Sequence, residues 1–364
     1  MAIVASLFGD LAQGQNLQAL IDDMLEQLYA ESYWRTYLEW GLPQTELTFS
    51  TAIGRARIEA AASLVDPDAP APLRSRNALE KLDGKIPTMK EKFALNQDDY
   101  RKLKALEALP ISDESKKQAL IKALWDDMKN AALSTDRRLD IMFFQGVSTF
   151  AIDATLLNNP DGVAYGSIPL LAKPSQKRGV AKVWTDPTAD PFTDIEDLVA
   201  YAATFGRSFK EIWIDLEMWL SMKKLTAVKS AISGYQNPGS NKNFVVTESS
   251  VNEYLVSNKL PMIKILNIRK GIEKDGIIDA INPFKKENVV FIPDGKLGIV
   301  HNAIAIEEWE KVEGINYAKY DRALLSKWRD NDPWREYTNV ELNAFPALES
   351  IDGIYILQTD VVAA

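Results

Sequence analysis

The sequence contains no cysteine and a single histidine, His301. The lack of cysteine excludes disulfides, thiolate metal sites and thiol nucleophiles, and it fits a chain made in a reducing cytoplasm. One histidine leaves room for a single Ser-His-Asp arrangement and for no cluster of histidine ligands around a metal. A lone histidine beside a predicted strand is usually a surface or packing residue, so we expect no catalytic role for His301.

Membrane segments and phosphate-binding loops are also missing. No apolar run approaches the roughly 20 residues that a bilayer span needs, and the N-terminal stretch MAIVASLFGDLAQGQ has no basic flank. Neither membrane insertion nor secretion is therefore expected. Gly295 and Gly298 lack the further glycines and the Lys-Ser/Thr ending of a phosphate loop. These absences predict no cofactor-binding site.

Acidic clusters are the remaining source of catalytic chemistry. They lie at Asp126 and Asp127 and at Glu307, Glu308 and Glu310, and they are typical of solvated helix faces. A glycosidase-type pair or a divalent cation site is the alternative interpretation. The net charge of -9 argues against nucleic-acid binding of the kind that basic domains show. We therefore predict no catalytic residue and no metal site.

The clearest predicted element is a long helix from Ser112 to Gly146. Pro110 and Ser112 mark its start, acidic residues fill its first turn, and no glycine or proline interrupts it before Gly146. At about 1.5 Å per residue it would be roughly 50 Å long, which indicates a structural spine. One apolar stripe is expected to pack it into a core: Ile121, Leu124, Trp125, Met128 and Ala132.

Shorter elements surround this helix. Residues 16–40 show helical periodicity, and a helix after Asp190 has Pro191 at its first position and Gly206 at its end. The stretch ENVVFIPDGKLGIVHNA predicts a hairpin around Asp294-Gly295, and a Gly276-containing Asp-Gly pair predicts another tight turn. Helices and strands are segregated along the chain, so the predicted fold class is α+β.

Two features point away from a self-contained domain. The stretch LVDPDAPAPLRSRNALEKLDGKIP, residues 64–87, has four prolines and eight charges, and loops of this length inside compact domains are usually functional. The nine tryptophans exceed what one small core needs, and aromatic anchors are enriched at interface centres, although core packing remains the usual role. A long spine helix, a polar arm and surplus aromatics are typical of a chain that assembles.

The order of these elements resembles the major capsid proteins of tailed bacteriophages, which have the HK97-like fold, and is most similar to the lambda-type head protein family. The resemblance rests on GVAKVWTDPTADPFTDIEDL (179–198), VVFIPDGKLG (289–298), the C-terminal LLSKWRDNDPWREYTNVELNAFPALESIDGIYILQTDV and the return strand in IPTMKEKFALNQDDY. It covers the chain from about Phe49 onward.

The resemblance implies a division of the chain. An extended two-stranded E-loop would reach over a neighbouring subunit, and its prolines would reduce the entropy lost on docking. Its expected contact residues are Asp66, Pro67, Pro70, Arg74, Arg76, Lys81 and Lys85. The expected parts are an N-terminal arm (1–48), the E-loop (49–97), a peripheral domain (98–185) with its spine helix (112–146), an axial domain (186–319) and a C-terminal return to the peripheral domain (320–364).

The resemblance also implies a function and partners. The chain would be a structural protein that forms pentamers and hexamers and closes into an icosahedral phage head assembled in the host bacterial cytoplasm. Expected partners are further copies of the chain, a separate scaffolding protein, a portal, a decoration protein and weakly contacted double-stranded DNA. Two alternatives stay open, namely an encapsulin-like nanocompartment shell and a soluble hydrolase that uses the acidic clusters.

Overall fold

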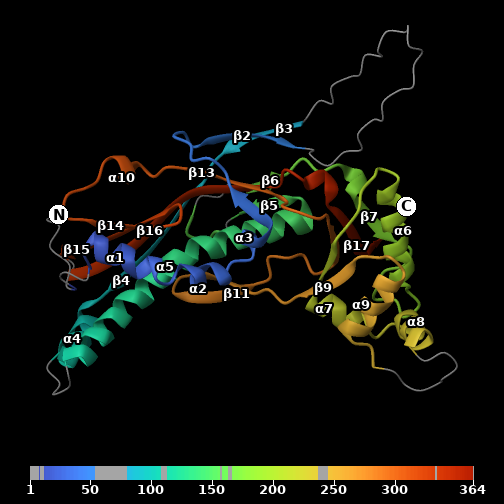
Figure 1. Ribbon diagram of the computed structural model, residues 1–364, viewed down its shortest axis with the longest axis horizontal. Coiled ribbons are helices and arrows are strands. Elements are labelled where there is room, and N and C mark those ends of the chain that lie inside the picture. The colour runs from blue at the N-terminus through green and yellow to red at the C-terminus, as the bar shows by residue number, and fades with distance from the viewer. Residues whose placement is uncertain are drawn as a thin grey trace, which may run out of the picture. The chain divides into compact units, whose positions relative to one another are not determined.

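The computed structural model describes Phe8 and residues 12–53, 80–107, 113–155, 158–162, 166–236, 245–332 and 334–363. Helices and strands are mixed but segregated, as the α+β prediction requires (Figure 1). Two compact units emerge: unit 1 comprises Met1–Phe49, Asp83–Asp140 and Ile299–Ala347, and unit 2 comprises Ser50–Leu82, Ile141–Gly298 and Leu348–Ala364. Among the described helices, none combines the length and the apolar character needed to cross a bilayer.

Unit 1 is built on a six-stranded sheet around the long strand β16 (Trp334–Ala347). One edge of β16 pairs with β15 (Ala323–Asn331). The second half of the same edge pairs with β13 (Gly298–Ala303), and the other edge of β16 pairs with β4 (Thr88–Leu95). The sheet is completed by β14 (Asn316–Tyr320) and β1 (Leu38–Trp40).

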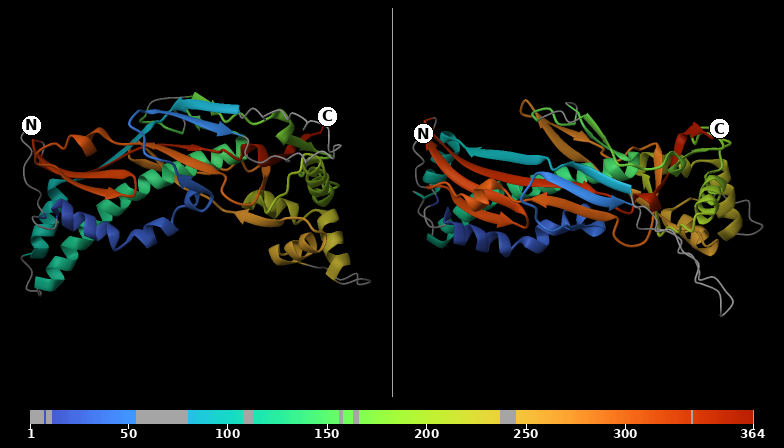
Figure 2. Two further views of the ribbon diagram at one scale, coloured as in Figure 1. Left: turned by 45° about the horizontal axis from the view of Figure 1, so that its top comes forward. Right: turned by 90° about the horizontal axis from the view of Figure 1, so that it is seen from above.

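Short helices accompany this sheet. The N-terminal helices α1 (Gly14–Asp22), α2 (Leu25–Ala30) and α3 (Trp34–Tyr37) lie close to the long helix α5 (Asp113–Thr149) in the views of Figure 1 and Figure 2. Residues 16–40 therefore do not form the single helix that their periodicity predicts. Asp22 and Asp23 end the first helix, where carboxylates oppose the helix dipole, and Leu38–Trp40 joins the sheet instead. The helices are α1 (Gly14–Asp22), α2 (Leu25–Ala30), α3 (Trp34–Tyr37), α4 (Gln97–Glu107) and α10 (Ile306–Trp309).

The predicted spine helix is present as α5 (Asp113–Thr149), about 55 Å long at about 1.5 Å per residue. It passes through Gly146 rather than ending there. A Cβ at Gly146 would lie 2.9 Å from a methyl group of Leu170, so the helix needs glycine for close packing and not for termination. The helix ends three residues later, before Phe150, whose φ is +59°.

Unit 2 contains a five-stranded sheet in the order β7-β17-β12-β8-β9. Helices α6 to α9 pack on it through an apolar cluster that includes Trp184, Trp219 and Phe291. The helix predicted after Asp190 is present as α6, and the Asp190 carboxylate accepts hydrogen bonds from the first-turn amides. The elements are β7 (Lys177–Val180), β17 (Tyr355–Val362), β12 (Asn288–Ile292), β8 (Glu211–Asp215), β9 (Met262–Leu266), α6 (Pro191–Ala203), α7 (Leu216–Met222), α8 (Thr226–Gln236) and α9 (Glu248–Ser257).

Two-stranded sheets complete the described fold. They are β2 (Thr48–Ile53) with β3 (Glu80–Lys85), β5 (Ala151–Ala154) with β6 (Gly166–Pro169), and β10 (Lys270–Lys274) with β11 (Ile277–Ile281).

Of the two Asp-Gly turns described above, one prediction is confirmed and the other is wrong. Asp275 and Gly276, with φ of +52° and +76°, make the tight turn between β10 and β11. The hairpin predicted around Asp294-Gly295 is wrong, because β12 pairs with β8 and β17 whereas β13 pairs with β16. Gly295 does adopt a positive φ of +89°, but the turn separates two strands that enter different sheets.

Candidate functional site

Two of the expected arm residues lie within the described chain. Lys81 and Lys85 are on β3, which pairs with β2, and both side chains are exposed. The other five, Asp66, Pro67, Pro70, Arg74 and Arg76, lie outside the described residues. The contact role of all seven stays a prediction.

Phe49 anchors the start of β2 in unit 1. Its ring, 5% exposed, stacks on His301 at 4.8 Å and on Phe345 at 4.9 Å between centroids. A Cβ at Gly84 of β3 would come within 2.7 Å of the Phe49 ring, so a glycine at this position leaves room for the ring. His301, 4% exposed, is thus a packing residue, as predicted.

The three expected packing residues of the spine helix have different surroundings. Met128 is buried, at 2% exposure, and Trp125 is half-buried. Leu124 lies on α5, but its side chain is outside the described part of the structure. The packing role of Leu124 therefore stays a prediction.

Arg35 on α3 links three parts of unit 1. Its guanidinium forms ion pairs with Asp136 of α5 at 3.0 Å and with Asp321 of the β14–β15 turn at 2.7 Å. Asp136 also accepts hydrogen bonds from the Trp34 indole at 3.0 Å and from the Tyr320 hydroxyl. The network fastens the N-terminal helices to the spine helix and to the sheet.

Burial and charge set the ionisation in this network. Burial lowers the pKa of Arg35, but the Asp136 and Asp321 carboxylates outweigh burial, so its pKa is raised overall. Burial, followed by the charge of Asp136, raises the pKa of Tyr320. Arg35 is therefore held as a cation and Tyr320 as a neutral hydrogen-bond donor.

A second buried cation lies between β15 and β16. The Lys327 ammonium, in a side chain 2% exposed, is 2.9 Å from the Thr338 hydroxyl and 3.4 Å from the Glu336 carboxylate, and it lies 5.0 Å from the centre of the Phe8 ring. Burial lowers the pKa of Lys327, while burial raises the pKa of Asp127 on α5, which also faces this cluster. The arrangement is a structural ion cluster inside unit 1.

The acidic clusters singled out in the sequence have different surroundings. Glu308 is bound to Lys319, Glu307 and Glu310 lie on or beside the short helix α10, and Asp126 is exposed. Across the described chain no three His, Cys, Asp or Glu side chains are grouped so as to hold a metal ion. Asp126 and Glu310 are exposed, as on a solvated helix face, whereas Asp127 and Glu308 are half-buried beside Lys327 and Lys319.

The tryptophans split between core and surface. Four are nearly fully buried: Trp34, Trp184, Trp213 and Trp219. Trp40, Trp328 and Trp334 are half-buried, and Trp309 is 55% exposed beside Ile306, which is 71% exposed. Core packing thus accounts for four of the nine, since Trp125 is half-buried as well, and α10 presents an apolar surface to solvent.

A second apolar surface is the β10–β11 ribbon of unit 2. Ile277 and Ile278 follow its turn and are 66% and 68% exposed. Ile277 is paired with Lys274, and Ile278 lies over Gly271, where a Cβ would be 2.8 Å from its methyl group. The ribbon thus carries isoleucines on both of its faces, with a lysine beside its turn.

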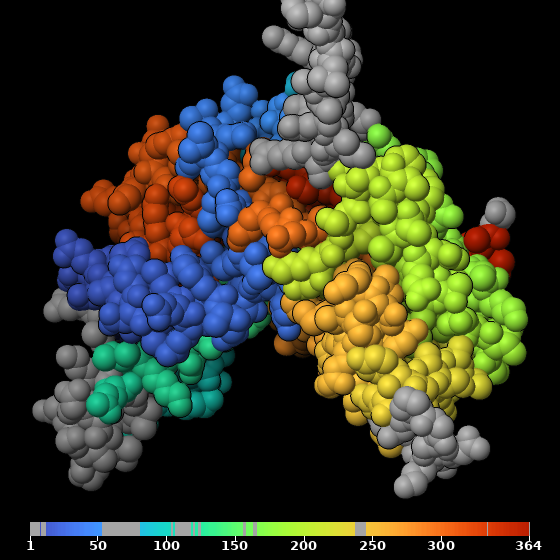
Figure 3. Space-filling view, turned by 45° about the vertical axis from the view of Figure 1, so that its right-hand side comes forward, coloured from blue at the N-terminus to red at the C-terminus, as the bar shows by residue number. Residues whose placement is uncertain are grey.

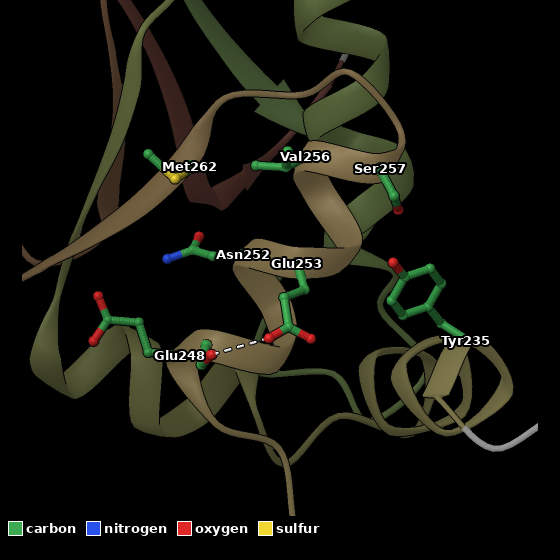
Figure 4. Close-up of a pocket in the computed structure, with 8 residues that line it drawn as sticks. Tyr235, Glu248, Asn252, Glu253, Val256, Ser257 and Met262 are labelled. Atoms are coloured by element: carbon green, nitrogen blue, oxygen red, sulfur yellow. Dashed lines mark hydrogen bonds between the residues drawn. The ribbon is translucent and has the colours of Figure 1, made fainter.

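An open depression of about 680 Å³ lies over the outer face of α9. In Figure 3 this helix belongs to the yellow-orange part of the surface of unit 2. We call the depression the α9 pocket. In Figure 4 the ring of Tyr235 faces α9 from the end of α8, and Met262 closes the opposite side. The side chains that line it are Tyr235, Glu248, Ser249, Asn252, Glu253, Val256, Ser257 and Met262. It combines apolar walls with two carboxylates.

Asn252 joins this pocket to the sheet edge. Its side-chain amide accepts a hydrogen bond from the Ile263 N–H at 2.7 Å and donates one to the Ile263 carbonyl at 3.0 Å. Because β9 is the edge strand of its sheet, Asn252 takes the place of a neighbouring strand at this position. The floor of the pocket is therefore fixed to the sheet.

Sequence analysis missed the Arg35 network, the Lys327 cluster and the α9 pocket. The partners in the Arg35 network lie about a hundred or more residues apart, and the outer face of a helix such as α9 cannot be oriented from one sequence. The partners of Lys327 lie on the neighbouring strand, but the sequence does not show that this strand pair is buried. Only the ribbon left a local signal, since the adjacent isoleucines directly follow a predicted Asp-Gly turn.

Comparison with known proteins gives a family and a fold. The sequence profile of the family described as phage major capsid protein E matches residues 31–359. A structure assigned as a prophage capsid protein of E. coli CFT073 superposes with a TM-score of 0.59 at 13% identity, covering 95% of this chain and 98% of the other. No curated protein matches in sequence.

Other solved structures align over comparable lengths. A phage-related protein from Bordetella bronchiseptica RB50 covers all of both chains at 10% identity with a TM-score of 0.49. The capsid protein of cyanophage A-1(L) covers 93% of both chains at 10% identity with a TM-score of 0.45. TM-scores as low as these two do not define a shared fold. The E. coli prophage structure, with a TM-score of 0.59, establishes the HK97-like capsid fold.

Proposed function

This chain belongs to the phage major capsid protein E family, so it is a capsid shell protein, and we propose that it assembles as pentamers and hexamers into an icosahedral head around double-stranded DNA. The observation that carries the proposal is the family match over residues 31–359. The encapsulin-like alternative is not favoured, because the matching family is a phage capsid family.

The arm from residue 49 to residue 97 is proposed to contact a neighbouring copy. Its described base supports this, since β2 is anchored at Phe49 while Lys81 and Lys85 on β3 are exposed. The remaining divisions (N-terminal arm 1–48, peripheral domain 98–185, axial domain 186–319 and C-terminal return 320–364) are kept as part of the proposal.

Further partners follow from the same proposal. The shell is proposed to assemble in the host cytoplasm on a separate scaffolding protein, to take up DNA through a portal and to bind a decoration protein on its outside. The net charge of -9 favours only weak, non-specific contact with packaged DNA. The chain is proposed to have no catalytic activity.

Electron microscopy and analytical ultracentrifugation of the purified full-length chain test the proposal. We expect capsomers or closed shells that form as the protein concentration rises. A small oligomer of fixed size at every concentration, with measurable hydrolytic turnover, would favour the hydrolase alternative. The arm is tested by the Lys81→Glu/Lys85→Glu variant, which should fold normally and lose shells, with Lys224→Glu as an exposed-lysine control in unit 2.

A further inference from the structure

The β10–β11 ribbon is poorly explained by the fold of one chain. Two-stranded ribbons are marginally stable alone, and this one pairs with no third strand among the described elements. Ile277 and Ile278 remain about two-thirds exposed on its opposite faces, and exposed apolar surface of this kind is available for contact with another molecule. The ribbon is therefore a candidate docking element.

The charged and apolar side chains of the ribbon define the partner surface that would complement it. The exposed Lys274 ammonium stands beside Ile277 next to the turn, and no ion pair of Lys274 is present within the described chain. A complementary site needs apolar walls for the isoleucines and a carboxylate for the lysine.

The α9 pocket has this composition. Tyr235, Val256 and Met262 are 44%, 50% and 50% exposed and form its apolar walls. Glu248 and Glu253 supply carboxylates. Glu253 accepts a hydrogen bond of 3.3 Å from the Ser249 hydroxyl, drawn as a dashed line in Figure 4, and another of 3.3 Å from the Gln236 amide. The depression of about 680 Å³ is open to solvent, so side chains of a ribbon can enter it from outside.

We propose that the β10–β11 ribbon of one copy inserts into the α9 pocket of the next copy, with Lys274 paired to Glu253 and Ile277 placed between Val256 and Met262. The contact joins two different surfaces of the same chain, so it is heterologous, and repeated contacts of this type form a ring when the rotation between copies closes. This inference rests on the proposed shell function and names one contact within a ring of subunits.

Charge exchange in the full-length chain tests the pairing. Lys274→Glu and Glu253→Lys should each weaken self-association by about tenfold or more in sedimentation velocity, because each places like charges together. The double variant Lys274→Glu/Glu253→Lys should recover most of the loss. Both positions are exposed, so thermal unfolding should match wild type, and Lys224→Glu is the control for charge reversal alone.

The absence of cysteine allows a direct contact test. Ile277→Cys and Val256→Cys chains, mixed and oxidised, should give a disulfide-linked dimer in higher yield than either variant alone. Ile306→Cys replaces an isoleucine of similar exposure in unit 1 and should give no such dimer with Val256→Cys.

The outcomes separate this inference from the shell function. Shells that form normally in both single charge variants, or a double variant no better than either single one, would overturn the ribbon contact and leave the shell function intact. A wild-type chain that never self-associates would overturn the shell function itself. Rescue by the double variant, together with the mixed disulfide dimer, would establish the contact.

Discussion

Arg35 and Asp136, 101 residues apart in the chain, form an ion pair in which the guanidinium Nη2 lies 3.0 Å from the carboxylate Oδ1. Their side chains are 15% and 3% exposed, so solvent screens the pair little. The pair connects the N-terminal helices to the spine helix, and its removal leaves Asp136 buried without its cation.

We therefore expect Arg35→Ala to lower the free energy of unfolding by about 3 kcal/mol, the lower end of the range for breaking a buried pair. Arg35→Lys should lose less, because one ammonium can serve Asp136 or Asp321 but cannot form both contacts with the same geometry. Urea unfolding followed by tryptophan fluorescence measures the loss. An Arg35→Ala chain as stable as wild type would show that the Arg35 network does not contribute to the free energy of unfolding.

The ring of Phe49 provides a second test. Phe49→Ala should cost about 3 to 5 kcal/mol, since it empties a site packed against His301 and Phe345. Phe205→Ala, at a side chain that is 49% exposed, should change stability by about 0.5 kcal/mol or less. Equal thermal stabilities of the two variants would contradict the anchoring role of Phe49.

Asp127 predicts a pH dependence of stability. Burial raises the pKa of Asp127 in the folded protein above its pKa in the unfolded chain. The contribution of this group to the free energy of unfolding is therefore fully present below the unfolded pKa and is lost as the pH rises through the folded pKa. Asp127→Asn should therefore be more stable than wild type at neutral pH, and the difference should vanish toward pH ~4.

The neighbouring Asp126→Asn is the matched control, because Asp126 is exposed. Melting temperatures of both variants and wild type across this pH range decide the matter. A constant difference between Asp127→Asn and wild type at every pH would mean that the effect comes from packing and not from ionisation.

The amide of Asn252 should stabilise the edge strand β9. Asn252→Ala removes both hydrogen bonds to Ile263 and should cost about 1 to 3 kcal/mol. In this variant, hydrogen exchange at the Ile263 amide should become faster than at the other amides of the sheet. Asn258→Ala, which removes one exposed bond to the Tyr254 carbonyl, serves as control and should leave Ile263 protected.

The net charge of -9 predicts weak DNA binding by the isolated subunit. Binding to duplex DNA in a mobility-shift assay should be visible only at low salt and should disappear at about 0.15 M, where the Debye length is about 8 Å. Tight binding that persists in salt would contradict this expectation and indicate a nucleic-acid-processing role.

Local chemistry explains which elements were predictable. The helix α6 follows from its Asp190 cap and Pro191, both of which act within one turn of the backbone. The spine helix follows from an uninterrupted run of helix-compatible residues. The error at Asp294-Gly295 has the same origin, since a tight turn has one local chemistry whether its flanking strands pair or enter separate sheets.

Non-local partners explain what remained hidden. Nothing near Arg35 in the sequence indicates that Asp136 and Asp321 will be its neighbours, and nothing near Lys327 distinguishes it from the many solvated lysines. The ribbon turn was predictable, but the exposure of Ile277 depends on the absence of a third strand, which is a property of the whole sheet arrangement.

The pairing of β4 with β16 has a consequence for synthesis on the ribosome. Leu95 meets Glu336, about 240 positions later in the chain, so at about 5 to 20 residues per second β4 waits roughly 10 to 50 seconds for its partner. The β17 strand, which lies inside the sheet of unit 2, is translated later still. A nascent chain therefore has neither sheet complete until residues 334–362 have emerged, and a truncated chain is a substrate for chaperones and proteases before it can be a building block.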